Sequence, residues 1–245
     1  MWQIYDDLIA LIPPHLTVQR LTRSQRRIYV QSDAGVGTAM LFTTKAVDLQ
    51  QDVGADLHTV AKKIKSWDFN QASIGLAAIN SYLNQPAQIN QAQLKLIDRQ
   101  DVFEEYLHCR QKMATIGHFH YLDHYPELKK RLTVFELQPS PGDYPASASE
   151  FLLPQMQVVF ITASTLVNKT LPRLLTLAQH AEVILVGGST PLADTLFQHG
   201  IHKLAATYLT ALPQTKKTKG QALVYLEKGT SHASNKAMGI DRVKF

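Results

Sequence analysis

The most chemically suggestive stretch of the sequence is the run His118, His120, Asp123 and His124. Imidazoles and a carboxylate at such short spacing are typical ligands of zinc, nickel, copper or iron. His120 and His124 share one face in a helix, whereas His118 and His120 share one side in an extended chain, so the run cannot hold all of them together. We predict that His118 acts as a metal ligand or as an acid/base, because an imidazole titrates near neutrality. His124 is better explained as a surface residue.

A second candidate group is the carboxylate of Glu136, nineteen positions after Gly117. That separation is typical of the ribose-binding acid of dinucleotide domains. The loop Gly117–Leu122 reads Gly-His-Phe-His-Tyr-Leu and lacks the glycines of the dinucleotide motif, so we do not expect ordinary NAD binding. We predict instead that Glu136 and Asp143 supply ligand or proton-transfer groups beside His118. The candidate catalytic residues are His118 and Glu136, and the candidate ligands of a divalent transition metal are His118, His120 and Glu136.

Two loops rich in small and hydroxyl residues, Thr162–Thr170 and Gly187–Pro191, are predicted to open helices, with Pro191 in the first turn of the second helix. Free N–H groups and the positive end of a helix dipole meet at such places and suit an anionic group. Each hydroxyl taken alone is better explained as a helix cap, and only the presence of two such loops favours a shared site. The predicted ligand-binding residues of the strand-end loops are Gly117, Asp143, Thr162, Ser164, Thr165, Asn168, Thr170, Gly187, Gly188, Ser189 and Thr190.

The elements that would position these groups alternate between strand and helix in the second half of the chain. Short apolar runs separated by helical patterns predict right-handed βαβ units and a parallel sheet. The run Val158–Ile161 is apolar at every position, as a strand covered on both faces requires. Ligands of such sheets bind beyond the carboxyl ends of the strands, where the candidate groups follow. The predicted strands are Met113–Ile116, Thr133–Leu137, Val158–Ile161, Val183–Val186 and Leu204–Tyr208.

The first half of the chain has a different pattern. We predict an amphipathic helix over Trp2–Ile12, then an antiparallel meander, two helices and a loop over residues 84–90. The predicted strands are Leu16–Leu21, Arg27–Gln31 and Gly37–Thr43, and the predicted helices are Leu57–Ser66 and Ser73–Leu83. A tight turn explains Gly35 and Gly37, and a local hydrogen bond explains Asn80, but all three are also candidates for the ligand site.

Composition narrows the classes of protein. The chain has 245 residues, a formal net charge of +5 and 45% hydrophobic residues, which is ordinary for one or two globular domains. Its basic clusters, such as Lys216–Lys219, do not alternate with aromatics, so we expect no nucleic-acid partner. No apolar run approaches the roughly 20 residues of a bilayer span, and Met1–Pro14 lacks the order of a signal peptide, so we expect no membrane partner and a cytoplasmic location. The single cysteine, Cys109, fits a reducing compartment, and a homodimer is the commonest oligomer.

Several stretches carry a resemblance to a known family: Gly35–Ala39, Ile74–Asn80, Ile116–Phe119, Val134–Leu137, Pro141–Pro145, Ile161–Thr170 and Val186–Pro191. They resemble a bacterial and archaeal family of unknown function to which heavy-metal chelation is ascribed, and the resemblance covers nearly the whole chain. It implies a small α+β domain like the amino-terminal domain of enolase over residues 1–105 and a Rossmann-like α/β domain over residues 106–245. It also implies a ligand cleft between them. His120 stands where proline is common in the family, and Gly188 replaces a proline often seen before Ser-Thr.

These observations lead to a ranked set of functions. We expect a small anionic or metal-associated ligand in the interdomain cleft, with heavy-metal chelation implied by the resemblance. The alternative is a metal-independent enzyme, a transferase or lyase, that acts on a nucleotide or a phosphorylated metabolite. A non-catalytic carrier or sensor is the third hypothesis, and it predicts tight binding without turnover.

Overall fold

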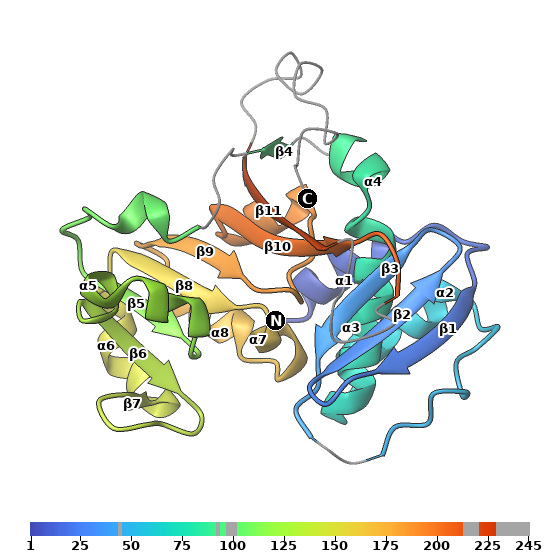
Figure 1. Cartoon of the computed structure of the whole chain (residues 1–245), viewed down its shortest axis with the longest axis horizontal. Helices are drawn as coiled ribbons and strands as arrows, with labels where there is room; N and C mark the ends of the chain where they lie inside the picture. The colour runs from blue at the N-terminus through green and yellow to red at the C-terminus, as the bar shows by residue number, and fades with distance from the viewer. Residues whose placement is uncertain (44–45, 92–93, 97–101, 213–220, 229–245) are drawn as a thin grey trace.

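The computed structural model describes residues 1–43, 46–91, 94–96, 102–212 and 221–228, and their strands form one curled mixed sheet (Figure 1). The strand order along its main path is β1-β2-β3-β10-β9-β8-β5-β6-β7. The first three strands are antiparallel, and the pair Leu209–Val36 joins β10 to β3 in antiparallel register. The strands from β10 to β7 are parallel to one another. The predicted α/β fold is therefore confirmed, with both parts of the chain contributing to a single sheet.

The first part of the chain is the predicted meander, backed by a long helix. It comprises β1 (Val18–Arg23), β2 (Arg27–Ser32) and β3 (Val36–Met40), and α3 (Phe69–Leu83) packs across the inner face of these strands. Gly37 permits this contact, because a Cβ atom at that position would lie 2.1 Å from a carbonyl oxygen of α3. The close approach of strand and helix therefore accounts for the second glycine of the turn region.

The other helices of the first part are shorter. They are α1 (Gln3–Ala10), α2 (Leu57–Ala61), the 3-10 turn η1 (Lys62–Lys65) and α4 (Pro86–Gln91). The predicted helix over residues 57–66 is thus split into an α-helical and a 3-10 part. The prediction of a loop over residues 84–90 is wrong: proline suits the first turn of a helix, where its missing N–H is not needed, and α4 begins at Pro86.

The second part of the chain forms a parallel sheet of β5 (Met113–Ile116), β6 (Leu132–Glu136), β8 (Val158–Thr162), β9 (Glu182–Val186) and β10 (Lys203–Leu209). All five predicted strands are confirmed to within one residue at each end. Numbered along the chain, they lie in the order 2-1-3-4-5, which is that of flavodoxin-like doubly wound sheets. The order reverses between β5 and β8, the point at which such sheets bind their ligands.

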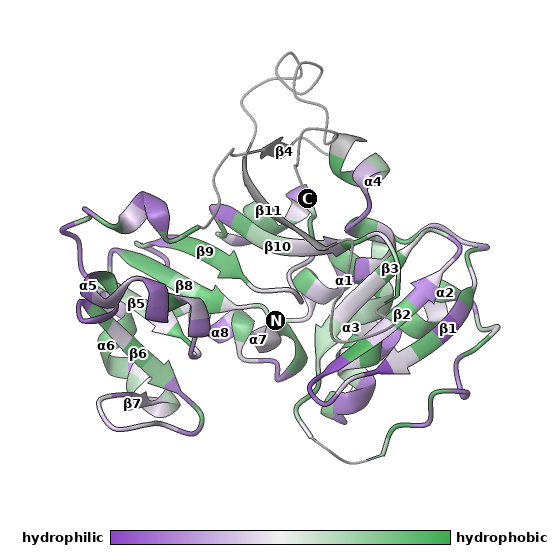
Figure 2. Ribbon diagram, viewed as in Figure 1, coloured by the Kyte–Doolittle hydropathy of each residue, from purple (hydrophilic) through white to green (hydrophobic). Residues whose placement is uncertain are grey.

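The central strands are covered on both faces, as their uniformly apolar sequences predicted (Figure 2). In β8, Val159 and Ile161 belong to the main hydrophobic cluster with residues of α7 (Ser164–Val167) and α8 (Leu171–Leu177). Val158 and Phe160 point the other way and pack with a second cluster around Phe103. Alternate side chains of one strand therefore serve two separate cores.

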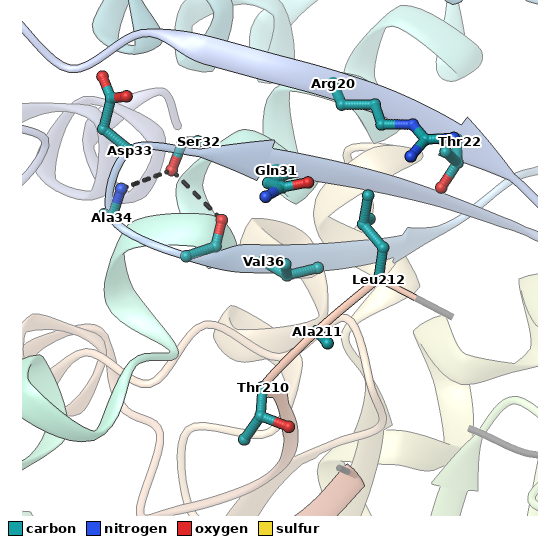
Figure 3. Close-up of a pocket in the computed structure, with 11 residues that line it drawn as sticks. Arg20, Thr22, Gln31, Ser32, Asp33, Ala34, Val36, Thr210, Ala211 and Leu212 are labelled. Atoms are coloured by element: carbon teal, nitrogen blue, oxygen red, sulfur yellow. Dashed lines mark hydrogen bonds between the residues drawn. The ribbon is translucent and has the colours of Figure 1, made fainter. Parts of the chain in front are cut away.

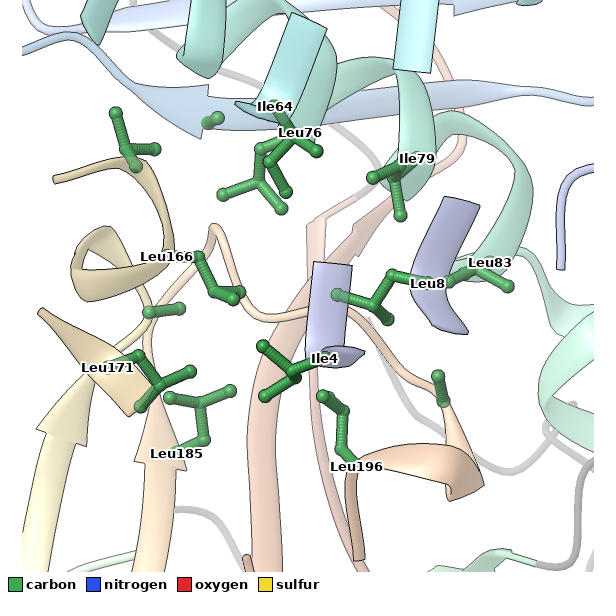
Figure 4. Packing of buried hydrophobic residues seen from close by; sticks show 14 of the residues in the cluster. Ile4, Leu8, Ile64, Leu76, Ile79, Leu83, Leu166, Leu171, Leu185 and Leu196 are labelled. Atoms are coloured by element: carbon green, nitrogen blue, oxygen red, sulfur yellow. The ribbon is translucent and has the colours of Figure 1, made fainter. Parts of the chain in front are cut away.

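The main cluster is shared by the two parts of the chain (Figure 4). Ile4 and Leu8 of α1 lie between Ile79 of α3 and the side chains of Leu171 and Leu185. All five side chains are at most 3% exposed. The predicted boundary between domains near residue 105 stays a prediction, and the two parts share a continuous apolar interior.

Two further features depart from the sequence-based expectations. The chain does not form a helix at Pro191: it runs irregularly to the 3-10 helix η6 (Asp194–His199). The strands β4 (Leu94–Leu96), β7 (Tyr144–Pro145) and β11 (Gln221–Lys228) were not predicted.

The basic cluster Lys216–Lys219 lies outside the described residues. Within the described part of the chain, no helix has both the length and the apolar character needed to cross a bilayer.

Candidate functional site

The loops that follow β5, β6, β8 and β9 form the carboxyl edge of the parallel sheet, and most of the predicted site residues lie in them. Gly117 follows β5 with a φ of 97°, a conformation that favours glycine. A Cβ atom there would lie 3.1 Å from Cγ2 of Thr162 and 4.0 Å from Oε2 of Glu136. Gly117 thus brings the ends of β5, β6 and β8 close together at the switch point.

The Glu136 carboxylate hydrogen-bonds to the backbone at this edge of the sheet. Its Oε2 accepts a hydrogen bond of 2.9 Å from the N–H of His118, and its Oε1 accepts one of 2.7 Å from the N–H of Leu137. Charge-assisted bonds of this kind fix the loop after β5 against the end of β6. The carboxylate predicted as catalytic or metal-binding is therefore already engaged with two backbone donors.

His118 forms a pair with Asp143. The His118 Nε2 and Asp143 Oδ2 atoms are 2.6 Å apart, and the same Oδ2 accepts from the N–H of Ser140 at 2.8 Å. The Asp143 side chain is 7% exposed and that of His118 is 34% exposed. An ionised carboxylate can only accept, so in this pair Nε2 is the donor. Nδ1 makes no hydrogen bond to a described residue, and in the neutral tautomer with the proton on Nε2 it can accept a proton.

The predicted metal ligands do not converge. His120 begins an exposed 3-10 helix, η3 (His120–His124), and Asp123 in that helix is paired with Lys129 at 2.6 Å. The hydrogen bond from Lys129 is the main cause that lowers the pKa of Asp123. Within the described part of the chain, no three His, Cys, Asp or Glu side chains are grouped so as to hold a metal ion. The donors present here therefore do not fit a preformed metal site, because His118 faces Asp143 and Glu136 faces backbone N–H groups.

Most side-chain hydrogen bonds of the loop after β8 are made within the loop. Oγ1 of Thr165 donates to the Thr162 carbonyl at 2.6 Å, and Oδ1 of Asn168 accepts from the N–H and the hydroxyl of Thr170 at 3.2 and 2.7 Å. These bonds are local, but neither α7 nor α8 has a side-chain hydrogen bond at its N-cap, so the capping explanation does not hold for Thr165. Ser164 differs, because its hydroxyl reaches the sulfur of Met40 on β3 at 3.5 Å. The loop after β8 therefore touches the first part of the chain through Ser164.

The loop after β9 is fastened to α3 by two asparagines. Nδ2 of Asn80 donates to the carbonyls of Thr38 and Ser189 at 2.9 and 3.0 Å. One helical turn later, Nδ2 of Asn84 donates to the Thr190 carbonyl at 2.9 Å, and its Oδ1 accepts from the N–H of Leu192 at 2.8 Å. These bonds hold the irregular loop after β9 against α3. Asn80, Ser189 and Thr190 are all at most 4% exposed, so they join the two parts of the chain.

Sequence reasoning missed Asn84, although its position four residues after Asn80 places it on the same helix face. The buried hydroxyl of Thr190 and the buried Oδ1 of Asn80 have no hydrogen-bond partner among the described residues. Gly35 lies apart from the carboxyl edge. A Cβ atom at Gly35 would lie 2.3 Å from the side chain of Gln85, and this glycine lines a separate pocket on the meander.

Arg27 is the other residue that the sequence did not single out. A Cβ atom on Gly188 would lie 2.6 Å from Nη1 of Arg27 and 3.2 Å from its Cζ, so the guanidinium rests against the loop after β9. Arg27 pairs across the strands with Met40, and both side chains lie on the outer face of the meander, away from α3. The guanidinium forms no ion pair or hydrogen bond with a described residue. A cation with no acidic partner among the described residues therefore stands beside Gly188 at the carboxyl edge.

This combination defines a mixed α/β protein in which an amino-terminal meander completes a parallel, doubly wound sheet. Residues 101–232 match the family model DUF364, and residues 5–83 match DUF4213; both carry the description "Putative heavy-metal chelation". The chain belongs to the DUF364 family.

Relatives with solved structures have the same fold. A DUF364 protein of unknown function from Desulfitobacterium hafniense is 34% identical, with a TM-score of 0.84 over 93% of this chain and 99% of that one. A second DUF364 structure of unknown function, from Pyrococcus horikoshii, is 20% identical with a TM-score of 0.73, over 91% and 98% of the two chains. An uncharacterised protein of Methanocaldococcus jannaschii is 27% identical over 191 residues, which are 74% of this chain and 68% of that protein.

Proposed function

We propose that this protein binds a small anionic ligand at the carboxyl edge, between Arg27 and the loops that follow β5 and β8. The observation that carries the proposal is the guanidinium of Arg27, held against Gly188 without an acidic partner among the described residues. Guanidinium groups bind carboxylates and phosphates through paired hydrogen bonds. The switch point between β5 and β8 is also where sheets of this order bind ligands.

Three further groups have the chemistry that such a ligand needs. Thr162 is partly exposed at the end of β8, and Ser164 follows it at the start of α7. His118, with its Nε2 held by Asp143, offers Nδ1 as a proton acceptor. The positive charge of Arg27 would attract the anionic ligand, and the hydroxyls of Thr162 and Ser164 would orient it by hydrogen bonds. His118 would accept or donate a proton.

The metal-associated form of the proposal has less support. The described donors form no group of three, so we propose the anion as the ligand that the protein itself recognises. Chelator-stripped protein titrated calorimetrically with Ni²⁺, Co²⁺, Cu²⁺, Zn²⁺ and Fe²⁺ tests this choice. Micromolar binding that is lost in His118→Ala would overturn it and would restore His118 as a ligand.

The His118–Asp143 pair also favours the second candidate function, an enzyme acting on a nucleotide or a phosphorylated metabolite. A thermal-shift screen with nucleotides, S-adenosylmethionine and sugar phosphates addresses both candidates, because a ligand that binds only the native state raises its stability. A stabilising compound that is consumed by the wild type and not by His118→Ala indicates an enzyme. A stabilising compound that is never consumed indicates a carrier or sensor.

The proposed cellular location and binding partners of the protein rest on its sequence. We propose a reducing cytoplasmic location, since Cys109 is the single cysteine and has no partner for an intrachain disulfide. A homodimer remains our expectation for the oligomer, on the frequency of two-fold dimers alone. Neither a nucleic acid nor a membrane is part of the proposed function.

A further inference from the structure

A pocket of about 730 Å³ lies on the outer face of the meander, beside the turn between β2 and β3 (Figure 3). One wall is formed by the strands and the turn between β2 and β3, and the other by the segment that leaves β10. Its volume is within the usual range for small-molecule sites, roughly 300–1,000 Å³. The lining residues are Arg20, Thr22, Gln31, Ser32, Asp33, Ala34, Gly35, Val36, Thr210, Ala211 and Leu212.

Strand register places the functional groups of the pocket in one row. Arg20 on β1 pairs with Gln31 on β2, and Gln31 pairs with Val36 on β3, so the three side chains share the outer face. In Figure 3 the side chain of Arg20 extends along β1 towards Thr22. Leu212 lies opposite this row, at the end of the segment from β10. The pocket thus has a polar floor with apolar patches at Val36 and Leu212.

The two charged residues of the pocket lining, Arg20 and Asp33, are not paired with each other. Its one acidic lining residue, Asp33, is committed elsewhere, because Oδ2 accepts from the N–H and the hydroxyl of Thr17 at 2.6 and 2.7 Å. These bonds, with a further one from Gln19, lower the pKa of Asp33, so it stays ionised without facing Arg20. Arg20, the one cation of the lining, forms no hydrogen bond or ion pair with a described residue. Among the described residues, the Arg20 guanidinium is therefore free to pair with an anionic ligand, while the Asp33 carboxylate is occupied by its own donors.

Two uncharged groups beside Arg20 also lack partners. The side-chain amide of Gln31 makes no hydrogen bond to a described residue, and Oγ1 of Thr22 is buried with no partner. A buried polar atom without a partner is destabilising, so a ligand that hydrogen-bonds to Thr22 gains by satisfying it. The hydroxyl of Ser32, in contrast, is already bonded to Ser81.

We infer that this pocket binds a small organic anion, a molecule with a carboxylate or phosphoryl group and a short carbon skeleton. Arg20 pairs with the anionic group, Gln31 and Thr22 hydrogen-bond to it, and the skeleton lies against Val36 and Leu212. Arg27 lies four residues before Gln31 on the same strand, roughly 13 Å away along β2. The pocket is accordingly a second site, and its occupancy does not depend on the function proposed for the carboxyl edge.

Calorimetric titration at constant ionic strength tests the inference with citrate as the carboxylate probe and glycerol 3-phosphate as the phosphoryl probe. The variants are Arg20→Gln, Arg27→Gln and the matched control Arg26→Gln, an exposed arginine that is not part of the pocket lining. We expect at least one probe to bind the wild type, with about tenfold weaker binding in Arg20→Gln and a change of less than about twofold in Arg26→Gln. Arg27→Gln reports whether a probe binds at the carboxyl edge instead. Thermal unfolding checks that each variant is folded, which we expect because Arg20 is exposed.

Two results would overturn the inference. One is that neither probe binds the wild type at concentrations up to about 10 mM. The other is that Arg20→Gln binds as well as the control. Loss in Arg27→Gln with retention in Arg20→Gln would refute this pocket and leave the carboxyl-edge proposal intact, whereas the reverse pattern would support the pocket alone.

Discussion

The guanidinium of Arg27 lies against Gly188 so closely that a Cβ atom at position 188 would be 2.6 Å from Nη1. The two residues come from different parts of the chain, the first from the start of β2 in the meander and the second from the loop after β9. The curl of the sheet brings them together. Their contact places a positive charge at the carboxyl edge, where His118 follows β5 and Thr162 ends β8.

This contact predicts the effect of Gly188→Ala. A methyl group at position 188 displaces the end of the Arg27 side chain, and we expect about tenfold weaker binding of anionic probes such as pyrophosphate. Gly188 does not have the positive φ that disfavours alanine, so the free energy of unfolding should change by less than about 1 kcal/mol. A double-mutant cycle with Arg27→Gln provides the control, because the alanine should have no further effect once the guanidinium is gone. Independent, additive losses would contradict the contact.

Asn84 is predicted to be a major stabilising residue between the two parts of the chain. Asn84→Ala leaves the Thr190 carbonyl and the Leu192 N–H without partners in a buried position, so we expect a loss of about 2–4 kcal/mol in the free energy of unfolding. Urea denaturation followed by circular dichroism measures it. Gln71→Ala on the same helix, whose side chain makes no hydrogen bond to a described residue, should change stability by less than about 0.5 kcal/mol. Equal effects of the two variants would show that these bonds contribute little.

Lys169 is predicted to titrate unusually early. Burial lowers the pKa of its amine to about 8. Its Nζ donates to the Val167 carbonyl at 2.6 Å and lies 5.9 Å from the ring centroids of Tyr5 and Phe69. Because the neutral amine is the reactive form, acetylation of Lys169 should reach half of its maximal rate near pH 8. Peptide mass spectrometry across pH 6–11 measures this rate, with exposed Lys62 as the reference. Identical pH profiles for the two lysines would refute the burial of the Lys169 amine.

The strands of the parallel sheet were predictable because their sequences allow little else. A run such as Val158–Thr162, apolar on both faces, is stable only when helices cover it on either side. Gly117 and His118 could also be placed at a strand end from the same pattern. The position of each strand-end residue thus follows from the strand that precedes it.

The features that could not be predicted from the sequence depend on contacts between residues far apart in the chain. The local pattern at Pro191 favours a helix, but Asn80 and Asn84 hold that irregular loop against α3. The metal set of His118, His120 and Glu136 was inferred from residue types, while the structure directs two of these side chains to other partners. Arg27 was overlooked because only the curl of the sheet brings β2 to the loop after β9.

The proposal that Arg27 binds an anion is tested most directly by the affinity of the protein for pyrophosphate, measured by calorimetry at constant ionic strength. The account predicts that wild type and Arg26→Gln bind pyrophosphate with similar affinity, and that Arg27→Gln binds it about tenfold more weakly, a loss of about 1.4 kcal/mol. Equal affinity of Arg27→Gln and Arg26→Gln, or no binding to the wild type at about 10 mM, would contradict an anion site at the carboxyl edge.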